Sequence, residues 1–416
     1  MFKKLLFIAV VFSVCQTFAQ NTIKTMFYNL LEFPRFLPGD RSILLQDILD
    51  NYEPDIFMVC ELQSQNGSDQ VLNIALNDEG ANYSAAPFVL NQSSSDTDLQ
   101  QMLYYRSSMF TLVYSEVIPT EVRDINRYVL RLNTEDQGTD PVLIEVYVTH
   151  LKSSQGSANQ TLRLNMVTEL TDHFANIDPD SFVIFSGDFN LYRATEPAYE
   201  EILDPTNAIV LVDPINRPGS WSSNTSFQDI HTQSTRTSSG PFGAGAGGGL
   251  DDRFDFIMIS ENMQTDPKLR YVPDTYKAYG NNGNCYNQNI NNVDCIGVFD
   301  QTTRDNIYNM SDHLPVVMEL ETNKEIVLST SEFEATTLQI ELENTIVVDE
   351  LRLQIAPTIS ETVSFTIYNT LGQNVLTAPA STSKTRLINV SHLTNGVYYL
   401  KNNQSLGNPI KFLKTS

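Results

Sequence analysis

The chain has 416 residues, with 26 lysines and arginines against 50 aspartates and glutamates, so its formal net charge is −24. Such acidity argues against a broad electrostatic grip on nucleic acid and leaves room only for a local basic strip or a cation bound in a cleft. The length suits one large domain followed by a smaller one, and an apolar content of 41% supports a full hydrophobic core.

Residues 1–19 have the features of a signal peptide. Two lysines form a positive start, residues 5–14 are apolar, and Ala19 ends a small-residue cleavage site. The apolar run is too short to span a bilayer, and no later segment is apolar for long enough. Cys15 does not follow the small residue that a lipoprotein signal needs, so we predict an exported protein without a lipid anchor.

Predicted strands and helices alternate between residues 22 and 320. Apolar runs and alternating patterns predict strands, and apolar residues at helical spacing predict helices. The predicted strands are 22–28, 56–60, 103–106, 111–118, 122–132, 142–148, 182–185, 253–259 and 316–320. The predicted helices are 42–50, 71–76, 162–174 and 196–203. Periodicity alone therefore indicates an α/β domain, which we place at residues 20–322.

A polar, glycine-rich stretch interrupts this alternation at residues 213–249. Residues 240–249 lack the Gly-Lys-Ser/Thr sequence of a phosphate-binding P-loop. We predict a flexible loop here, with a mobile active-site lid as the alternative.

The remaining cysteines have two environments. Cys60 lies in an apolar run and is predicted to be a buried free thiol. Cys285 and Cys295 flank an Asn-rich loop, and in an exported protein we predict a disulfide that closes this loop.

Two short motifs at strand ends carry side chains that can perform chemistry. Asp188 and Asn190 end a buried strand in Gly-Asp-Phe-Asn, and Asp312 and His313 precede the last strand in Ser-Asp-His. A carboxylate can orient or deprotonate a water molecule, and a carboxamide can donate to an anionic oxygen. The first motif alone is weak, since Asp and Asn also end strands for local reasons.

Other strand ends carry polar residues that each have a structural explanation. Glu61 follows a buried strand, where a carboxylate needs a metal, a water molecule or a salt bridge. Considered by itself, Asn29 would be interpreted as a turn former and His150 as a hydrogen-bonded histidine. Asp255 would be interpreted as a buried partner of Arg253. Their joint order along the chain favours a shared function.

Gly187-Asp-Phe-Asn190 and Ser311-Asp-His313 together resemble the endonuclease/exonuclease/phosphatase superfamily, the DNase I-like enzymes that cut phosphoester bonds with a divalent metal. The resemblance spans roughly residues 22–320 and implies a four-layer α/β sandwich of two packed mixed sheets with outer helices. The chain departs from the commonest pattern of the family at Leu30-Leu-Glu-Phe33 and at Cys60. The resemblance therefore does not specify which residues form the substrate pocket.

The resemblance implies a magnesium site, with calcium or manganese as alternatives. Asn29, Glu61 and Asp312 would hold the ion, with Glu61 as the principal ligand, in keeping with the preference of hard cations for oxygen. Asp188 and Asn190 match the residues that place the attacking water and hold the phosphate.

The resemblance also implies roles for histidines and arginines. His313 would face the phosphate as a charged donor oriented by Asp255, because a nearby carboxylate favours the protonated ring. His150 matches the acid that protonates the leaving group. Arg106 and Arg123 fall where the family often places phosphate-facing side chains.

The composition changes after residue 322. Short strands separated by turns predict a small β-sandwich at residues 336–416, after a linker at 323–335. Three segments resemble the type A C-terminal sorting domain of the bacterial type IX secretion system: 365–373, 390–400 and 411–414. A carbohydrate-binding or adhesin-type module is the alternative. The resemblance implies handling by the type IX machinery and a secreted or cell-surface protein.

These expectations combine into a secreted metal-dependent phosphodiesterase, with a nuclease for extracellular DNA or RNA as the first hypothesis. The acidity keeps a second hypothesis open, in which the substrate is a phospholipid such as sphingomyelin or a phosphomonoester. A third hypothesis is a non-catalytic surface-binding protein. The expected partners are a nucleic acid or other phosphodiester and the secretion machinery, and the protein is expected to be a monomer.

Overall fold

The computed structural model describes residues 21–80, 82–93, 99–327, 340–342, 345–355, 363–370, 373–381, 385–402 and 410–416. The chain divides into two compact units between Ser329 and Thr330, and each unit is described by itself. The predicted signal peptide lies outside the described residues, as does the predicted linker from residue 328 onward.

Two mixed sheets form the centre of the first unit. The first contains, in order, β11 (Arg270–Tyr271), β13 (Val316–Thr322), β1 (Asn21–Phe33), β2 (Ile56–Leu62), β4 (Gln100–Arg106) and β3 (Tyr83–Ala85). A further short strand, β12 (Lys277–Ala278), also pairs with β13. The second contains β5 (Phe110–Ile118), β6 (Ile125–Leu132), β7 (Leu143–His150), β8 (Phe182–Asp188), β10 (Asp255–Ser260) and β9 (Leu211–Val212).

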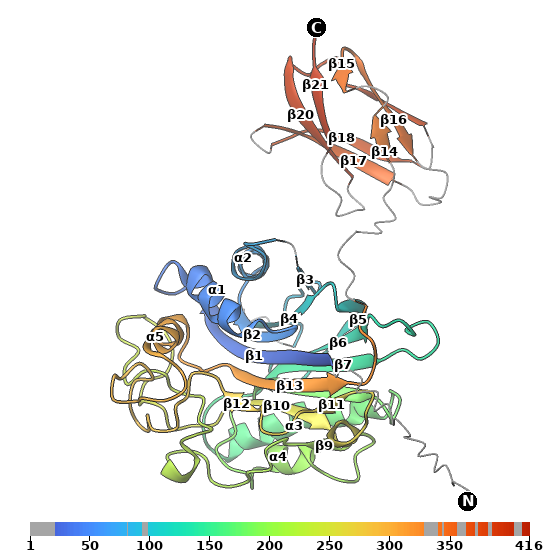
Figure 1. The fold of residues 1–416 in the computed structure, drawn as a ribbon. Helices are drawn as coiled ribbons and strands as arrows, with labels where there is room; N and C mark the ends of the chain where they lie inside the picture. The colour runs from blue at the N-terminus through green and yellow to red at the C-terminus, as the bar shows by residue number, and fades with distance from the viewer. Residues whose placement is uncertain are drawn as a thin grey trace, which may run out of the picture. The chain divides into compact units, whose positions relative to one another are not determined.

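Helices lie on the outer sides of the two sheets (Figure 1). On the side of the first sheet are α1 (Arg41–Tyr52), α2 (Gln65–Gln70), the π-helical turn η1 (Val71–Leu76) and α5 (Gln301–Met310), which packs on α1. On the side of the second are α3 (Ser157–Phe174) and α4 (Pro197–Ile202). Two short 3-10 turns, η2 (Thr225–Phe227) and η3 (Glu261–Gln264), complete the unit.

Two apolar cores hold these layers together. Phe57 of the first sheet shares one core with Val146 and Ile257 of the second, so the sheets pack face to face. Leu170 of α3 shares the other core with Phe185 of β8. The order helix, sheet, sheet, helix is that of a four-layer sandwich, and the expected α/β class is confirmed.

The strand directions bring several chain segments to one edge. β1 runs parallel to β2, and β7 runs parallel to β8, so the carboxyl ends of each pair lie together. β10 and β13 run antiparallel to β8 and β1 and therefore begin where those strands end, with Asp255 opposite Asp188 and Val316 opposite Phe27. The sheet topology thus places the predicted motifs side by side.

The second unit consists of two small sheets around one core. One sheet contains β14 (Ile340–Leu342), β16 (Glu350–Ile355) and β19 (Thr385–Asn389). The other contains β15 (Ile346–Val347), β21 (Ile410–Lys414), β20 (Gly396–Asn402), β17 (Val363–Asn369) and β18 (Asn374–Ser381). Leu351, Phe365 and Phe412 are buried in the shared core, in keeping with the predicted small β-sandwich.

Some elements differ from the sequence-based expectations. β1 and β2 continue past Asn29 and Glu61, so both residues lie within strands rather than after them. The α5 helix was not predicted, because its apolar residues are sparse. The first residues of the predicted linker belong to the first unit, since the Val327 N–H donates to the Asn133 carbonyl and Lys324 Nζ lies 2.6 Å from Asp136. Within the described ranges, no helix has the length and apolarity that crossing a bilayer would require.

Candidate active site

A buried cluster of acids and histidines lies where the ends of the two sheets meet. Asn29 Nδ2 connects the sheets, since it donates to Glu61 Oε1 at 3.0 Å and to Asp188 Oδ2 at 3.1 Å. His150 faces the same two carboxylates, with Nδ1 3.9 Å from Glu61 and Nε2 3.6 Å from Asp188. Four residues that are far apart in the sequence therefore share one site.

His313 lies on the other side of Asp188 in an acid–histidine pair. Its Nδ1 is 2.7 Å from Asp255 Oδ2, and its Nε2 is 3.7 Å from Asp188 Oδ2. Ser311 supports this segment, because its hydroxyl donates to the Asn29 carbonyl at 2.7 Å and accepts from the His313 N–H at 3.1 Å. The orientation of His313 by Asp255 is the arrangement that the resemblance implies.

The backbone beside the cluster is locally strained. Glu61 has a φ of 59°, which non-glycine residues rarely adopt and which costs on the order of 1–3 kcal/mol. The Glu32 N–H compensates by donating to Glu61 Oε2 at 3.0 Å. Asn190 has a φ of 52°, which Asn tolerates better, and its N–H donates to Asp188 Oδ1 at 3.0 Å. A Cβ on Gly187 would lie 2.3 Å from the Thr149 carbonyl oxygen. The close approach of β7 and β8 therefore requires glycine at position 187.

Burial of the carboxylates makes this site suited to a cation. Burial raises the pKa of Glu61, and the neighbouring Asp312 raises it further. Burial also raises the pKa of Asp188, to about 8, against the opposing influence of His313. Among the described side chains, Asp312 Oδ1 and Asp255 Oδ1 are buried without a hydrogen-bond partner. A divalent ion would stabilise such carboxylates, and hard cations prefer these oxygen ligands.

Two overlapping groups of ligand atoms lie within 4.8 Å of one another, as a metal site requires. One group is Glu61, His150 and Asp188, and the other is Asp188, Asp255 and His313. Glu61 is thus in a position to bind an ion, whereas Asp312 belongs to neither group but is close enough to raise the pKa of Glu61.

The expected role of Asn29 as a metal ligand stays a prediction. Its Oδ1 accepts from the Leu31 N–H at 3.0 Å, and its amino group faces Glu61 and Asp188. In this arrangement Asn29 is a donor that holds the two acids together.

The two histidines are in opposite electrostatic situations. Burial lowers the pKa of His150 well below its usual value, and Arg123 and His313 lower it further. These effects favour the neutral ring of His150, and its expected role as the leaving-group acid stays a prediction. Burial alone would lower the pKa of His313 too, but Asp255, Asp312 and Asp188 outweigh it and raise this pKa well above the usual value.

The two arginines expected to contact phosphate lie in different places. Arg123 is beside the cluster, but its Nη1 donates to the carbonyls of His150 and Leu151, both at 3.0 Å, so it supports the backbone there. Arg106 pairs with Asp55 at 2.7 Å, directly before β2 begins. Because Glu61 lies six residues after Asp55 along an extended strand, Arg106 is about 20 Å from the cluster, and this placement does not support its predicted role as a phosphate contact.

Sequence reasoning missed Gln233, which lies in the polar segment before β10. Its Nε2 is 2.6 Å from His313 Nε2 and 3.2 Å from Asp312 Oδ2. The segment is brought there by hydrogen bonds from the Thr232 and Gln233 N–H groups to the Asp252 carbonyl. No pattern in the sequence marks Gln233, since its neighbours are ordinary loop residues.

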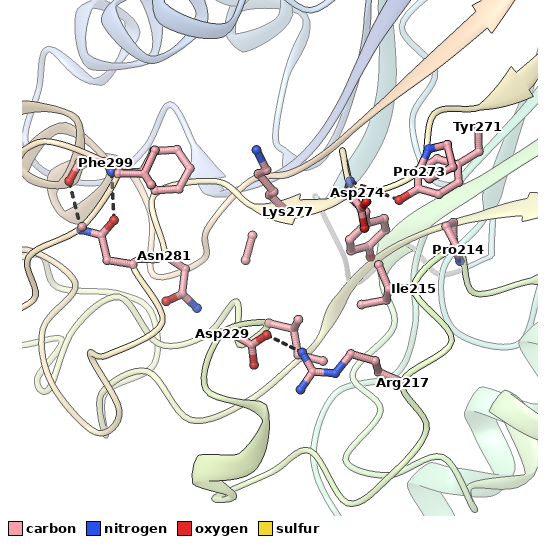
Figure 2. Close-up of a pocket in the computed structure, with 16 residues that line it drawn as sticks. Pro214, Ile215, Arg217, Asp229, Tyr271, Pro273, Asp274, Lys277, Asn281 and Phe299 are labelled. Atoms are coloured by element: carbon pink, nitrogen blue, oxygen red, sulfur yellow. Dashed lines mark hydrogen bonds and ion pairs between the residues drawn. The ribbon is translucent and has the colours of Figure 1, made fainter.

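A cavity of about 610 Å³ lies elsewhere in the first unit (Figure 2). Ile215, Pro273 and Phe299 line it, and Arg217 and Asp229 form an ion pair at its wall. Among the described residues that line this cavity there is no histidine or cysteine, and we take the acid–histidine cluster as the candidate catalytic centre.

The predicted disulfide between Cys285 and Cys295 is formed, with the two Cα atoms 5.4 Å apart. Cys60 is a buried free thiol, as predicted. The disulfide-closed loop lies beside the glycine-rich segment that precedes β10, because the Ile290 N–H donates to the Thr235 carbonyl at 2.8 Å.

Comparison with known proteins identifies the C-terminal part of the chain. Residues 347–413 match the family described as the secretion system C-terminal sorting domain. The sorting domain expected from the sequence is therefore confirmed, and it implies export to the cell surface or the surroundings. A comparison with curated protein sequences gives no match.

Solved structures similar to this chain include TDP2 of D. rerio with a single-strand DNA product, the human Nocturnin catalytic domain with bound sulfate, and an endonuclease/exonuclease/phosphatase family protein from Bacteroides thetaiotaomicron. Their sequence identities to this chain are 17%, 17% and 15%, and the TM-scores are 0.47, 0.45 and 0.45. The alignments cover 72%, 72% and 74% of this chain and 99%, 97% and 97% of those chains. The Bacteroides protein carries the family name that the sequence motifs suggested.

Proposed function

We propose that this protein is a secreted hydrolase of phosphodiesters that depends on a divalent metal, and that its substrate is extracellular DNA or RNA. The observation that carries the proposal is the buried group of Glu61, His150 and Asp188, joined through Asp188 to the Asp255–His313 pair. Phosphoester hydrolysis needs an activated water and positive groups that stabilise the developing charge, and this group offers both.

Each residue has a task that follows from its contacts. Magnesium, the expected ion, would be held by Glu61 with Asp188 or Asp312 beside it, and when bound it neutralises phosphate charge. Asp188 would orient or deprotonate the attacking water through its carboxylate. His313, charged and held by Asp255, donates to the phosphate through Nε2. Neutral His150 contributes a further hydrogen bond.

Gln233 is part of this mechanism because its amide nitrogen lies 2.6 Å from His313 Nε2, a contact that a charged ring with a proton on Nε2 cannot keep. A phosphate oxygen that accepts from His313 has to displace the Gln233 side chain or share the position with it. The side chain therefore stands at the entrance to the phosphate position.

A small phosphoester is the second candidate substrate, because five buried arginines of the first unit bind groups of the protein itself. Arg41, Arg163, Arg236, Arg253 and Arg304 are each at most 3% exposed. Their guanidinium groups bind carbonyls or carboxylates of the protein itself, as Arg163 does with Glu196 at 2.6 Å. They are unavailable to the backbone of a long polyanion, which favours a substrate whose recognition is confined to the cleft.

The test is a substrate panel with the purified mature protein. DNA, RNA, sphingomyelin and a chromogenic bis-phosphoester are incubated with magnesium, with calcium, with manganese and with chelator. The proposal expects cleavage of a nucleic acid that stops on chelation and returns with added metal. Cleavage of sphingomyelin or a monoester alone supports the second candidate, and full activity after exhaustive chelation contradicts metal dependence.

A further inference from the structure

The glycine-rich segment is packed directly on Asp312, the second acid of the site. The Ala246 N–H donates to Asp312 Oδ2 at 2.6 Å, and Gln233 Nε2 donates to the same oxygen at 3.2 Å. Asp312 Oδ1 is buried and has no protein partner among the described residues. The carboxylate is therefore held by one oxygen, and the other remains available.

The approach of the segment to Asp312 depends on glycine at position 245. A Cβ there would lie 3.0 Å from Asp312 Cγ and 3.1 Å from Oδ2, and the φ of +87° disfavours any other residue. The segment is also closed on itself, since the Ser234 hydroxyl donates to the Ala246 carbonyl at 2.9 Å. Phe242 packs on the Arg236 guanidinium, 3.6 Å from the ring centre, and anchors the tip.

The disulfide-closed loop supports both ends of this segment. At the start, the Thr237 N–H donates to Asn289 Oδ1 at 2.6 Å. At the end, Leu250 exchanges hydrogen bonds with the loop, donating to the Gln288 carbonyl and accepting from the Asn287 N–H. A Cβ on Gly249 would lie 2.4 Å from the Asn287 carbonyl carbon, so the two segments are in close contact.

We propose that the turn Gly245–Ala246, together with Gln233, is a positioning clamp for Asp312, and that the Cys285–Cys295 loop keeps the clamp in place. The clamp holds Oδ2 and directs Oδ1 toward a cation bound at Glu61. This inference rests on the proposed function. It replaces the expected flexible loop with a fixed support for the metal site, and it makes the support depend on a disulfide that forms outside the reducing cytoplasm.

The chain offers a matched pair of substitutions that separates the clamp from general loop strain. Gly245→Ala adds a methyl group against Asp312, whereas Gly243→Ala adds one at a similar positive φ of +74° with nothing within 4 Å. Both variants strain the backbone, but only the first displaces the carboxylate. Gln233→Ala removes the second donor to Asp312 Oδ2 without straining the backbone. This variant tests the clamp if Gly245→Ala does not fold.

The experiment measures binding of Mn²⁺ alone to each full-length variant by electron paramagnetic resonance, without substrate, beside a thermal melt. Gly245→Ala and Gln233→Ala should weaken Mn²⁺ binding about 10- to 100-fold, the usual effect of losing a group that orients a ligand. Gly243→Ala should bind as the wild type does. Thiol reduction should weaken Mn²⁺ binding by the wild type. A Cys285→Ser/Cys295→Ser variant should bind Mn²⁺ weakly from the start, and reduction should not change its affinity.

The outcomes distinguish the clamp from the function on which it rests. A wild-type protein that binds no divalent cation overturns the proposed function, and the clamp with it. A wild-type protein that binds Mn²⁺ while Gly245→Ala and Gln233→Ala bind it as tightly as Gly243→Ala overturns the clamp alone.

Discussion

Replacing Asp255 by Asn tests whether His313 works as a charged donor. Asp255 Oδ2 and His313 Nδ1 are 2.7 Å apart, and both side chains are buried. At an effective dielectric constant of about 20, unit charges at that 2.7 Å separation attract by about 6 kcal/mol. The Asn side chain can still accept from Nδ1–H, so Asp255→Asn removes this attraction and keeps the ring orientation.

The expected result follows from the sign of the change. His313 acts as an imidazolium, so activity is lost as pH rises through its pKa, and removing Asp255 lowers that pKa. The alkaline limb of the pH–rate profile should therefore move to lower pH, and turnover at neutral pH should fall about 10²- to 10³-fold, as for loss of one charge-stabilising donor. His313→Ala should lose at least as much.

The assay combines pH–rate profiles on a chromogenic bis-phosphoester with an NMR titration of the His313 ring protons. In a His313→Ala background, Asp255→Asn should have little further effect, because the two residues act as a unit. An unchanged alkaline limb together with an unchanged His313 titration would refute the reasoning.

The remaining predictions concern the cation, the arginines and export. Glu61→Gln should weaken Mn²⁺ binding at least about 10-fold; an unchanged titration would place the principal ligand elsewhere. Because the pKa values of Glu61 and Asp188 are raised, that of Asp188 to about 8, cation affinity should rise with pH up to that value with proton release, measurable by calorimetry in two buffers. Arg106→Met should leave kcat/KM unchanged, whereas Arg41→Met should lower stability by about 3 kcal/mol or more in chemical denaturation, since several buried carbonyls lose a donor. Mass spectrometry of the released protein should find that it lacks residues 1–19 and the sorting domain, and an intact sorting domain on a freely secreted active protein would favour a binding module.

The sequence allowed the position of a candidate site residue to be predicted wherever that residue lies at the end of a regular strand. Asp188 and Asp255 could be placed because a buried apolar run gives the strand, and the strand gives the position of the next side chain. The face-to-face packing of the sheets then brought Glu61 and Asp188 together, which periodicity alone does not specify. The resemblance supplied that step.

Contacts made by loops were beyond reach of the sequence. Gln233 and Ala246 lie in a polar, glycine-rich stretch that has no period, and their positions depend on hydrogen bonds to distant backbone. The unexpected position of Arg106 has a related cause. Strand β4 was predicted, but its antiparallel pairing with β2 places Arg106 opposite the start of β2 rather than its end. Strand direction is decided by tertiary pairing and not by composition.

Composition also leaves open what the arginines do. A count of arginines does not distinguish surface charges from buried ones, and several arginines here donate to backbone carbonyls next to the site. Arg41 binds the Leu31 carbonyl after Asn29 and the Met310 carbonyl before Ser311, and Arg236 binds the Tyr308 carbonyl. Buried carbonyls need donors, and one guanidinium satisfies several at once. Since these charges stabilise the loops that carry the acids, attraction of a phosphoester has to come from the site itself and its bound cation rather than from the surface field of an acidic protein.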